Sequence, residues 1–117
     1  MITAAVLCAL LRITDGDTFH AACPQPVIVR IANIDAPELD KCPGDAARSA
    51  DTLARLLTGT LTVQPLYLDR RGRTVATVTA QGQDVGQAML DTGAAKYWPH
   101  TNKGKAREPR PKWRECR

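Results

Sequence analysis

The sequence is poor in aromatic side chains, which make up only 4% of its 117 residues. This excludes a core built on aromatic rings, and we expect one of Val, Ile, Leu and Ala instead. Long apolar runs are also missing. The run at residues 2–11 spans ten residues, whereas a membrane-spanning helix needs about 20. It lacks a positively charged start, so we read it as the first core strand rather than a signal peptide, and we expect no membrane contact.

The four cysteines show none of the spacings typical of a metal site. There is no C-x-x-C pair, which argues against structural zinc, and neither histidine is expected to bind a metal. Cys8 lies in an apolar run and is expected to be a buried free thiol. Cys23, Cys42 and Cys116 lie in predicted loops, where one disulfide of open connectivity would suit an exported protein. There is no EF-hand loop, so a Ca²⁺ site would have to combine residues distant in sequence.

Positive charge is concentrated at the C-terminal end. The net charge of the chain is +4, but residues 103–117 hold seven Lys or Arg against Glu108 and Glu115, which is +5. The rest is nearly neutral. A neutral domain over residues 1–98 with a basic, Pro-containing tail over 99–117 suits a polyanionic partner, although a solvated, partly disordered tail explains the charge equally well.

The hydrophobic pattern predicts a chain that is mainly β. Residues 27–34 form a β-branched apolar run that ends before Pro37, so we expect a buried strand there. Further strands are expected over residues 61–68, where Pro65 predicts a bulge or an edge, and over 75–78. No internal repeat or low-complexity segment competes with a single compact domain.

Two segments have helical periodicity. Residues 44–57 predict the main helix, and residues 84–91 predict a short second one that ends before Gly93. The expected buried face of the main helix contains Ala46, Ala47, Ala50, Leu53, Ala54 and Leu57. The architecture that fits is α+β: a five-stranded antiparallel barrel with one main helix packed on it.

Three motifs carry the charged residues that point to chemistry. They are the turn Asp15-Gly16-Asp17-Thr18, the strand exit from Arg30 to Glu38, and the segment Asp69-Arg70-Arg71-Gly72-Arg73. A hairpin that returns to the strand exit would bring Asp17 near Asp35. Two carboxylates at one site repel each other unless a cation lies between them, and a hard cation prefers oxygen ligands. Each motif alone is equally well explained by an ordinary turn with a surface ion pair.

In this order and at these separations the three motifs resemble those of the staphylococcal nuclease, or thermonuclease-like, family. The resemblance covers roughly residues 5–97. It implies an OB-type barrel and a Ca²⁺-dependent endonuclease that hydrolyses DNA or RNA, single-stranded or frayed, to 3′-phosphate and 5′-hydroxyl products. A monomer is expected.

The resemblance also implies roles for individual residues. Asp17, Asp35 and the Ala36 carbonyl would bind Ca²⁺, with Asp15 behind them. Glu38 would orient or deprotonate the attacking water, and Arg30 and Arg73 would bind the phosphate. The nucleic-acid-binding residues would be Arg70, Arg71, Tyr97 and Trp98.

The chain departs from the family pattern at two of these positions. Ala36 replaces a Thr, which leaves a backbone carbonyl ligand unaffected. Arg71 replaces an aromatic residue, so base stacking there gives way to cation–π or phosphate contact. Tyr97 and Trp98 would then supply the stacking surface, or else only cover the end of the barrel. The shorter C-terminal part predicts that the family's last helix is absent or rebuilt.

Two other function classes remain open. A catalytically silent nucleic-acid-binding module on the same fold would be expected to lose the Arg, Asp and Glu set, which is intact here. A Ca²⁺-binding interaction domain would gain nothing from two neighbouring arginines. A nuclease is therefore the favoured prediction.

Overall fold

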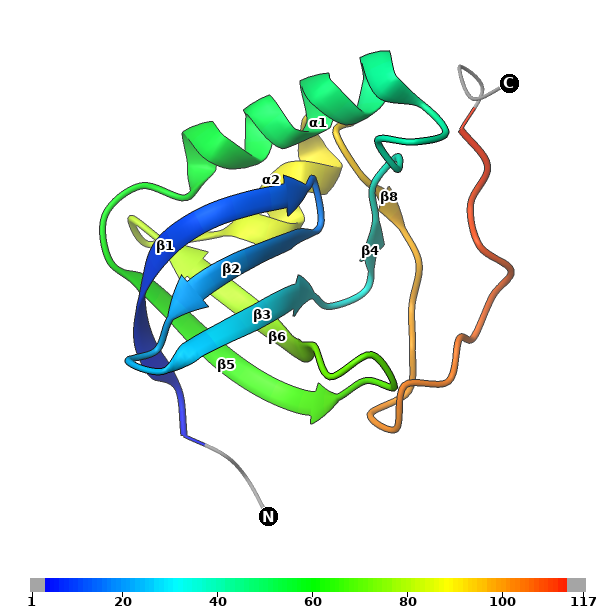
Figure 1. The fold of residues 1–117 in the computed structure, drawn as a ribbon. Coiled ribbons are helices and arrows are strands. Elements are labelled where there is room, and N and C mark those ends of the chain that lie inside the picture. Colours follow the sequence, from blue (N-terminus) through cyan, green and yellow to red (C-terminus); the bar gives the residue numbers. More distant parts are fainter. Residues whose placement is uncertain (1–3, 114–117) are drawn as a thin grey trace.

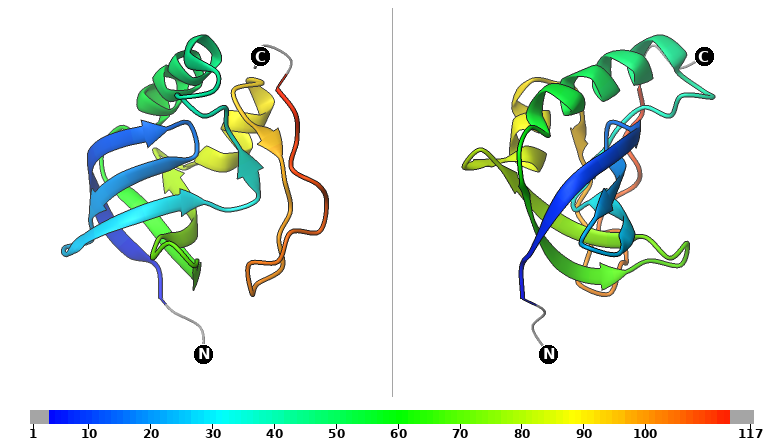
Figure 2. Two further views of the ribbon diagram at one scale, coloured as in Figure 1. Left: turned by 45° about the vertical axis from the view of Figure 1, so that its right-hand side comes forward. Right: turned by 60° about the vertical axis from the view of Figure 1, so that its left-hand side comes forward.

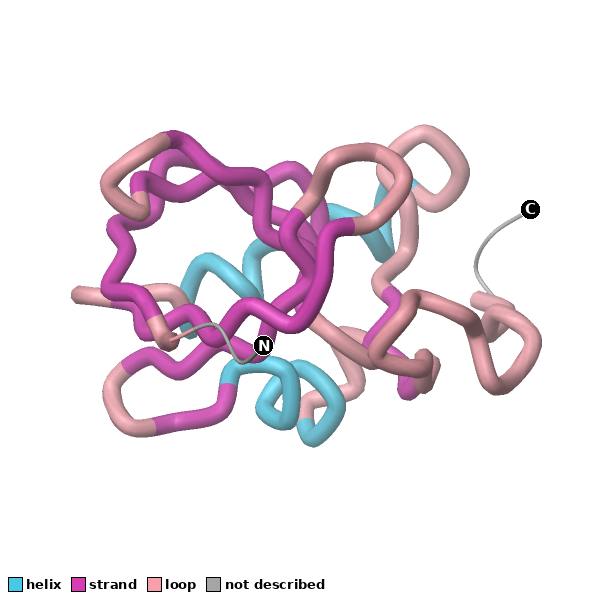
Figure 3. The backbone as a smooth tube through the Cα atoms, turned by 90° about the horizontal axis from the view of Figure 1, so that it is seen from below, coloured by secondary structure: helices cyan, strands magenta, loops and turns pink. Residues whose placement is uncertain are grey.

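A closed five-stranded β-barrel forms the body of the protein (Figure 1). In the computed structural model, which describes residues 4–113, the barrel strands are β1 (Val6–Asp15), β2 (Thr18–Ala22), β3 (Pro26–Ile31), β5 (Leu61–Leu68) and β6 (Thr74–Ala80). They pair in the order β3-β2-β1-β5-β6, and β3 also pairs with β6, which closes the ring seen from below in Figure 3. The predicted OB-type α+β fold is confirmed. The closing β3–β6 junction is parallel, whereas an antiparallel barrel was expected.

Small aliphatic side chains fill the barrel, as the composition predicts. Phe19 is the one aromatic residue in the buried core of the described chain, and it is fully buried. Around it lie Val, Ile, Leu and Ala side chains from the strands, together with Leu53 and Met89 from the two helices. The core residues alternate along β6 with exposed threonines, as expected for a strand with one face inward.

Two helices close one end of the barrel (Figure 2). The main helix α1 (Pro43–Leu56) packs on β1 and on the short α2 (Val85–Asp91), which follows the two-residue strand β7 (Gln83–Asp84). Both helices were predicted. The buried face of α1 differs from the expected one, because Ala47 and Ala54 are exposed and Ser49 is buried in their place. The Ser49 hydroxyl donates to the Ala94 carbonyl at 2.7 Å, which compensates its burial.

The predicted strand over residues 27–34 is interrupted. β3 ends at Ile31, a turn follows with Asn33 at a φ of 64°, and β4 (Ile34–Asp35) leaves the barrel to pair with β8 (Lys96–Tyr97). Asn tolerates this left-handed conformation better than the β-branched residues around it. The Asn33 carbonyl and side chain also accept hydrogen bonds from the backbone of Trp98 and His100, each at 2.9 Å. The break therefore attaches the C-terminal part of the chain to the barrel.

The prediction that Cys8 is a free thiol is wrong. Cys8 on β1 forms a disulfide with Cys23, which follows β2, and the two Cα atoms lie 4.3 Å apart. The register pairs Ala9 with Ala22, so the hairpin places the two cysteines side by side. The apolar setting of Cys8 concealed this, since it suits a buried thiol and a buried disulfide equally. Cys42 is also disulfide-bonded, and Cys116 lies outside the described residues.

The segment from residue 99 to 113 runs back beside β4 and β8 (Figure 1, orange to red). It contains no helix over these residues, as expected from its composition. The division of the chain into a domain over residues 1–98 and a tail over 99–117 stays a prediction. Among residues 4–113, no helix is both long and apolar enough to cross a membrane.

Candidate active site

Three connections of the barrel meet at one cleft. The β1–β2 turn carries the first motif, the exit of β3 through β4 carries the second, and the β5–β6 turn carries the third. The cleft has a volume of about 560 Å³, and the charged residues that line it include Asp15, Asp17, Arg30, Asp35, Glu38, Arg71, Arg73 and Arg110. The fold thus brings together the charged residues singled out from the sequence, except Asp69 and Arg70, which line a neighbouring groove.

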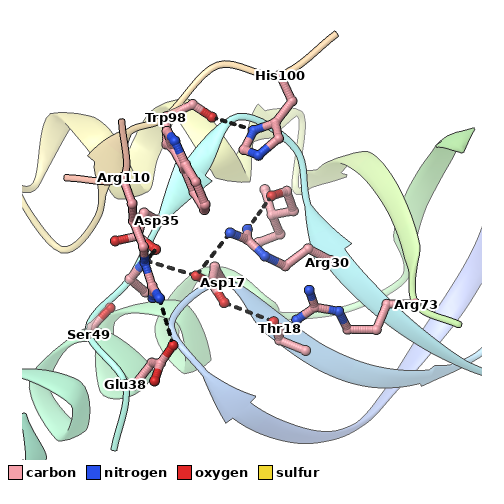
Figure 4. Close-up of polar contacts among 12 residues, drawn as sticks. Asp17, Thr18, Arg30, Asp35, Glu38, Ser49, Arg73, Trp98, His100 and Arg110 are labelled. Carbon is pink, nitrogen blue, oxygen red and sulfur yellow. Dashed lines mark hydrogen bonds and ion pairs between the residues drawn. The ribbon is translucent and has the colours of Figure 1, made fainter. Parts of the chain in front are cut away.

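Asp17 connects the first motif to the second (Figure 4). One of its oxygens, Oδ2, accepts the Ala36 backbone N–H at 2.8 Å, and the other accepts the Thr18 hydroxyl at 2.8 Å. Arg30 lies on β3, opposite Thr18 of β2. Its Nη2 is 3.5 Å from Asp17 Oδ2, and its Nη1 donates to the Ile31 carbonyl. The Asp17 carboxylate is buried and held in one orientation, with Arg30 as its counter-charge.

Gly16 is required for close packing and not for a left-handed backbone conformation. It does not take a positive φ, so flexibility is not what the position needs. A Cβ built there would lie 1.8 Å from Ser49 Oγ and 3.0 Å from Ala36 Cβ. Only glycine lets the acidic turn approach both helix α1 and the second motif this closely.

Asp15 has a carboxyl group whose pKa is shifted by its surroundings. Burial, followed by the negative charge of Asp17, raises the pKa of Asp15 to about 6. Its Oδ1 atom is buried without a hydrogen-bond partner in the described part of the chain. An unpaired buried carboxylate oxygen is costly, and a cation or its bound water would satisfy it.

The donor set fits a hard cation. Asp15, Asp17, Asp35 and the Ala36 carbonyl offer only oxygen, as Ca²⁺ prefers. Among residues 4–113 no three His, Cys, Asp or Glu side chains are grouped closely enough to hold a metal by themselves. The predicted set does not require this, because it has two direct carboxylate ligands and a backbone carbonyl.

Arg73 is positioned by the turn before it. Gly72 has a φ of 79°, and Asp69 accepts the backbone N–H groups of Arg71 and Arg73 at 2.9 Å each. Asp69 Oδ2 also accepts Arg73 Nε at 2.7 Å. Burial raises the pKa of Asp69, but the hydrogen bonds from Arg73 outweigh it, so the pKa lies below its usual value. Asp69 binds Arg73 through Nε, and the Arg73 side chain lines the cleft.

A basic groove of about 580 Å³ continues from the cleft. Its polar and aromatic lining residues include Arg30, Tyr67, Arg70, Arg71, Arg73, Trp98, His100, Lys103 and Lys105. Trp98 borders both groove and cleft, whereas Tyr97 lines neither and is 58% exposed elsewhere. Sequence reasoning missed Tyr67 and His100, and it counted Lys103 and Lys105 only as members of the basic tail. The basic run after residue 102 was the one signal for the two lysines.

The C-terminal segment adds two residues that the sequence did not suggest. Arg110 Nε donates to Asp35 Oδ1 at 3.0 Å, and Arg110 Nη1 lies 2.9 Å from Glu38 Oε1. Trp113 Nε1 donates to the other Asp35 oxygen at 3.0 Å. The bond from Arg110 holds the pKa of Glu38 below its usual value. No motif marks these residues, since they lie about 75 positions from their partner.

Comparison with known proteins shows the family of the chain. Residues 28–114 match the family described as staphylococcal nuclease homologue. The chain belongs to this family. Its members are generally nucleases, and these typically use Ca²⁺. The chain is also 34% identical over 110 residues to Protein ParB of Escherichia coli, an alignment that covers 86% of this chain and 60% of that protein. The chain thus spans about three fifths of the length of that relative.

Proposed function

We propose that this protein is a Ca²⁺-dependent nuclease that hydrolyses phosphodiester bonds of DNA, RNA or both, leaving 3′-phosphate and 5′-hydroxyl ends. One observation carries the proposal. Carboxylates and arginines from three separate motifs line one cleft, and that cleft opens beside a basic groove. A structural ion-pair network does not require such a groove, whereas a polyanionic substrate does.

The groove suits a single strand. Arg70, Arg71, Lys103 and Lys105 would contact the backbone phosphates, and Trp98 offers a ring on which a base can stack. Arg30 and Arg73 lie where groove and cleft meet. They would hold the phosphate to be cleaved, because a guanidinium offers two parallel donors to phosphate oxygens.

Asp17, Asp35 and the Ala36 carbonyl would hold the cation, and Asp15 would reach it through a water molecule. When bound, the cation would polarise a phosphoryl oxygen. Arg30 and Arg73 would together stabilise the negative charge on the phosphoryl oxygens as the nucleophile attacks phosphorus.

Glu38 is the proposed base. Its lowered pKa keeps it ionised at neutral pH, so it can accept a proton from the attacking water. Glu38 and Asp35 both line the cleft and both contact Arg110, and the cleft is large enough to admit water.

The second candidate is a nucleic-acid-binding module without activity. The ion pairs of Arg110 with Asp35 and Glu38 favour it, because a carboxylate held by an arginine is a weaker base. A cleavage assay separates the two. Purified protein is incubated with single-stranded DNA or RNA in Ca²⁺ or in chelator, and the product ends are identified. Cleavage in Ca²⁺ alone that yields 3′-phosphates supports the nuclease, whereas binding without cleavage supports the silent module.

A further inference from the structure

Both oxygens of Asp35 are bound by the C-terminal segment. Arg110 Nε holds Oδ1 and Trp113 Nε1 holds Oδ2, each at 3.0 Å (the Arg110 contact is visible in Figure 4). The Asp35 side chain is only 1% exposed. A buried carboxylate without donors would be strongly destabilised, so these two bonds compensate the burial of Asp35 and hold its side chain in one orientation.

The two donors leave Asp35 able to bind something else. A carboxylate offers about four acceptor positions on its two oxygens, and each oxygen here uses one for the segment. Arg110 reaches further, since its Nη1 holds Glu38 at 2.9 Å. One guanidinium therefore fixes the distance between the proposed cation ligand and the proposed base.

The segment itself is anchored on both sides of Arg110. The Trp98 indole donates to the Glu108 carbonyl at 2.8 Å, and Lys96 Nζ donates to the Lys112 carbonyl at 2.5 Å. Arg110 also lies 5.7 Å from the Trp98 ring centre, and Lys96 lies 4.6 Å from that of Trp113. Because hydrogen bonds hold the segment on both sides of Arg110, the segment is fixed against the barrel and is not a flap that opens.

We propose that Arg110 and Trp113 are positioning residues, which hold Asp35 and Glu38 in the orientation that cation binding and hydrolysis require. The inference rests on the proposed function. Donors that orient a metal-binding carboxylate typically matter by about 10- to 100-fold in metal affinity or activity. The C-terminal segment is then part of the site, and not only a basic tail that attracts substrate.

Two substitutions that conserve charge test this. Arg110→Lys keeps the positive charge but loses the separate Nε and Nη1 donors that hold the two carboxylates, and Trp113→Phe keeps the ring beside Lys96 but removes the donor. Arg107→Lys is the matched control, because Arg107 is an exposed arginine of the same segment whose backbone N–H donates to the Pro99 carbonyl, a bond that lysine retains. Calorimetry gives the Ca²⁺ affinity, and cleavage assays give kcat and KM. Melting temperature shows that each variant is folded.

We expect Ca²⁺ affinity, kcat or both to fall about 10- to 100-fold in Arg110→Lys and Trp113→Phe, with KM nearly unchanged and Arg107→Lys like wild type. Variants that match wild type would overturn the inference, since charge alone would then suffice. Tighter Ca²⁺ binding would also overturn it, because the segment would then compete with the cation. A wild-type protein that neither binds Ca²⁺ nor cleaves overturns the proposed function as well, so the two failures are distinguishable.

Discussion

At the scale of single residues, a substitution of Glu38 distinguishes an effect on catalysis from an effect on Ca²⁺ binding. Glu38→Gln keeps the shape of the side chain and its place beside Arg110 but removes the basic oxygen. We expect kcat to fall about 10² to 10⁴-fold, as when a general base is lost. Ca²⁺ affinity should stay close to wild type, and Glu108→Gln serves as an exposed control. A kcat within about threefold of wild type would remove Glu38 from the mechanism.

Arg73 must bind two partners at once. Its Nε is engaged by Asp69, and its Nη groups are proposed to hold the phosphate. A lysine at this position has a single donor nitrogen and cannot reproduce the separate Nε and Nη contacts. We therefore expect Arg73→Lys to lower kcat by about 10²-fold with a smaller change in KM. If Arg73 only stabilises the turn, melting temperature will fall slightly and kcat will not change.

Asp15 predicts a pH dependence of stability. Its folded pKa of about 6 lies above the ordinary value of 3.8, so the folded state binds the proton more tightly. Between these two values stability falls as pH rises, and the cost is fully present above about pH 6. In chelator, Asp15→Asn should therefore raise melting temperature more at about pH 7 than at about pH 4. An equal rise in melting temperature at both pH values would show that the charge of the Asp15 carboxylate does not destabilise the folded state.

At the scale of elements, the contact between the β1–β2 turn and helix α1 positions the first motif. Gly16→Ala would place a Cβ against Ser49, a side chain whose hydroxyl is held by Ala94. We expect a loss of about 1–3 kcal/mol in the free energy of unfolding, measured in urea.

Gly44→Ala is the control for this overpacking. Gly44 lies on α1 as well, but its nearest contact would be an Arg48 side-chain nitrogen at 3.7 Å. Alanine is the better helix former, so this variant should be neutral or more stable. If Gly16→Ala were equally harmless, the turn and the helix would not be in the close contact described.

At the scale of the whole molecule, the basic groove should make binding sensitive to salt. Lys103→Ala/Lys105→Ala removes two groove cations, and without Ca²⁺ the affinity for single-stranded DNA can be measured free of cleavage. The slope of log affinity against log salt should shrink by about 0.7 for each phosphate that is no longer neutralised. Arg12→Ala/Arg55→Ala removes the same charge outside the groove and should leave the slope almost unchanged. Equal slopes in both double variants would mean that only net charge matters.

Much of the fold was predictable because its signals are local. The period of the apolar residues located α1 and α2, Pro65 located the irregularity in β5, and Gly72 located the β5–β6 turn. Errors arose where a local pattern suits two structures. An apolar setting suits both a thiol and a disulfide at Cys8, and a β-branched run did not reveal the turn at Asn33.

The sequence by itself determined the barrel, its two helices and the three motifs, because hydrophobic period, turn residues and motif spacing are properties of neighbouring positions. Only the tertiary structure decided which side chains surround Asp35. Arg110 and Trp113 reach it across about 75 residues, after the chain has crossed β8 and turned back. No local pattern encodes such a contact, since its partners are chosen by the packing of the complete chain and not by their own neighbours.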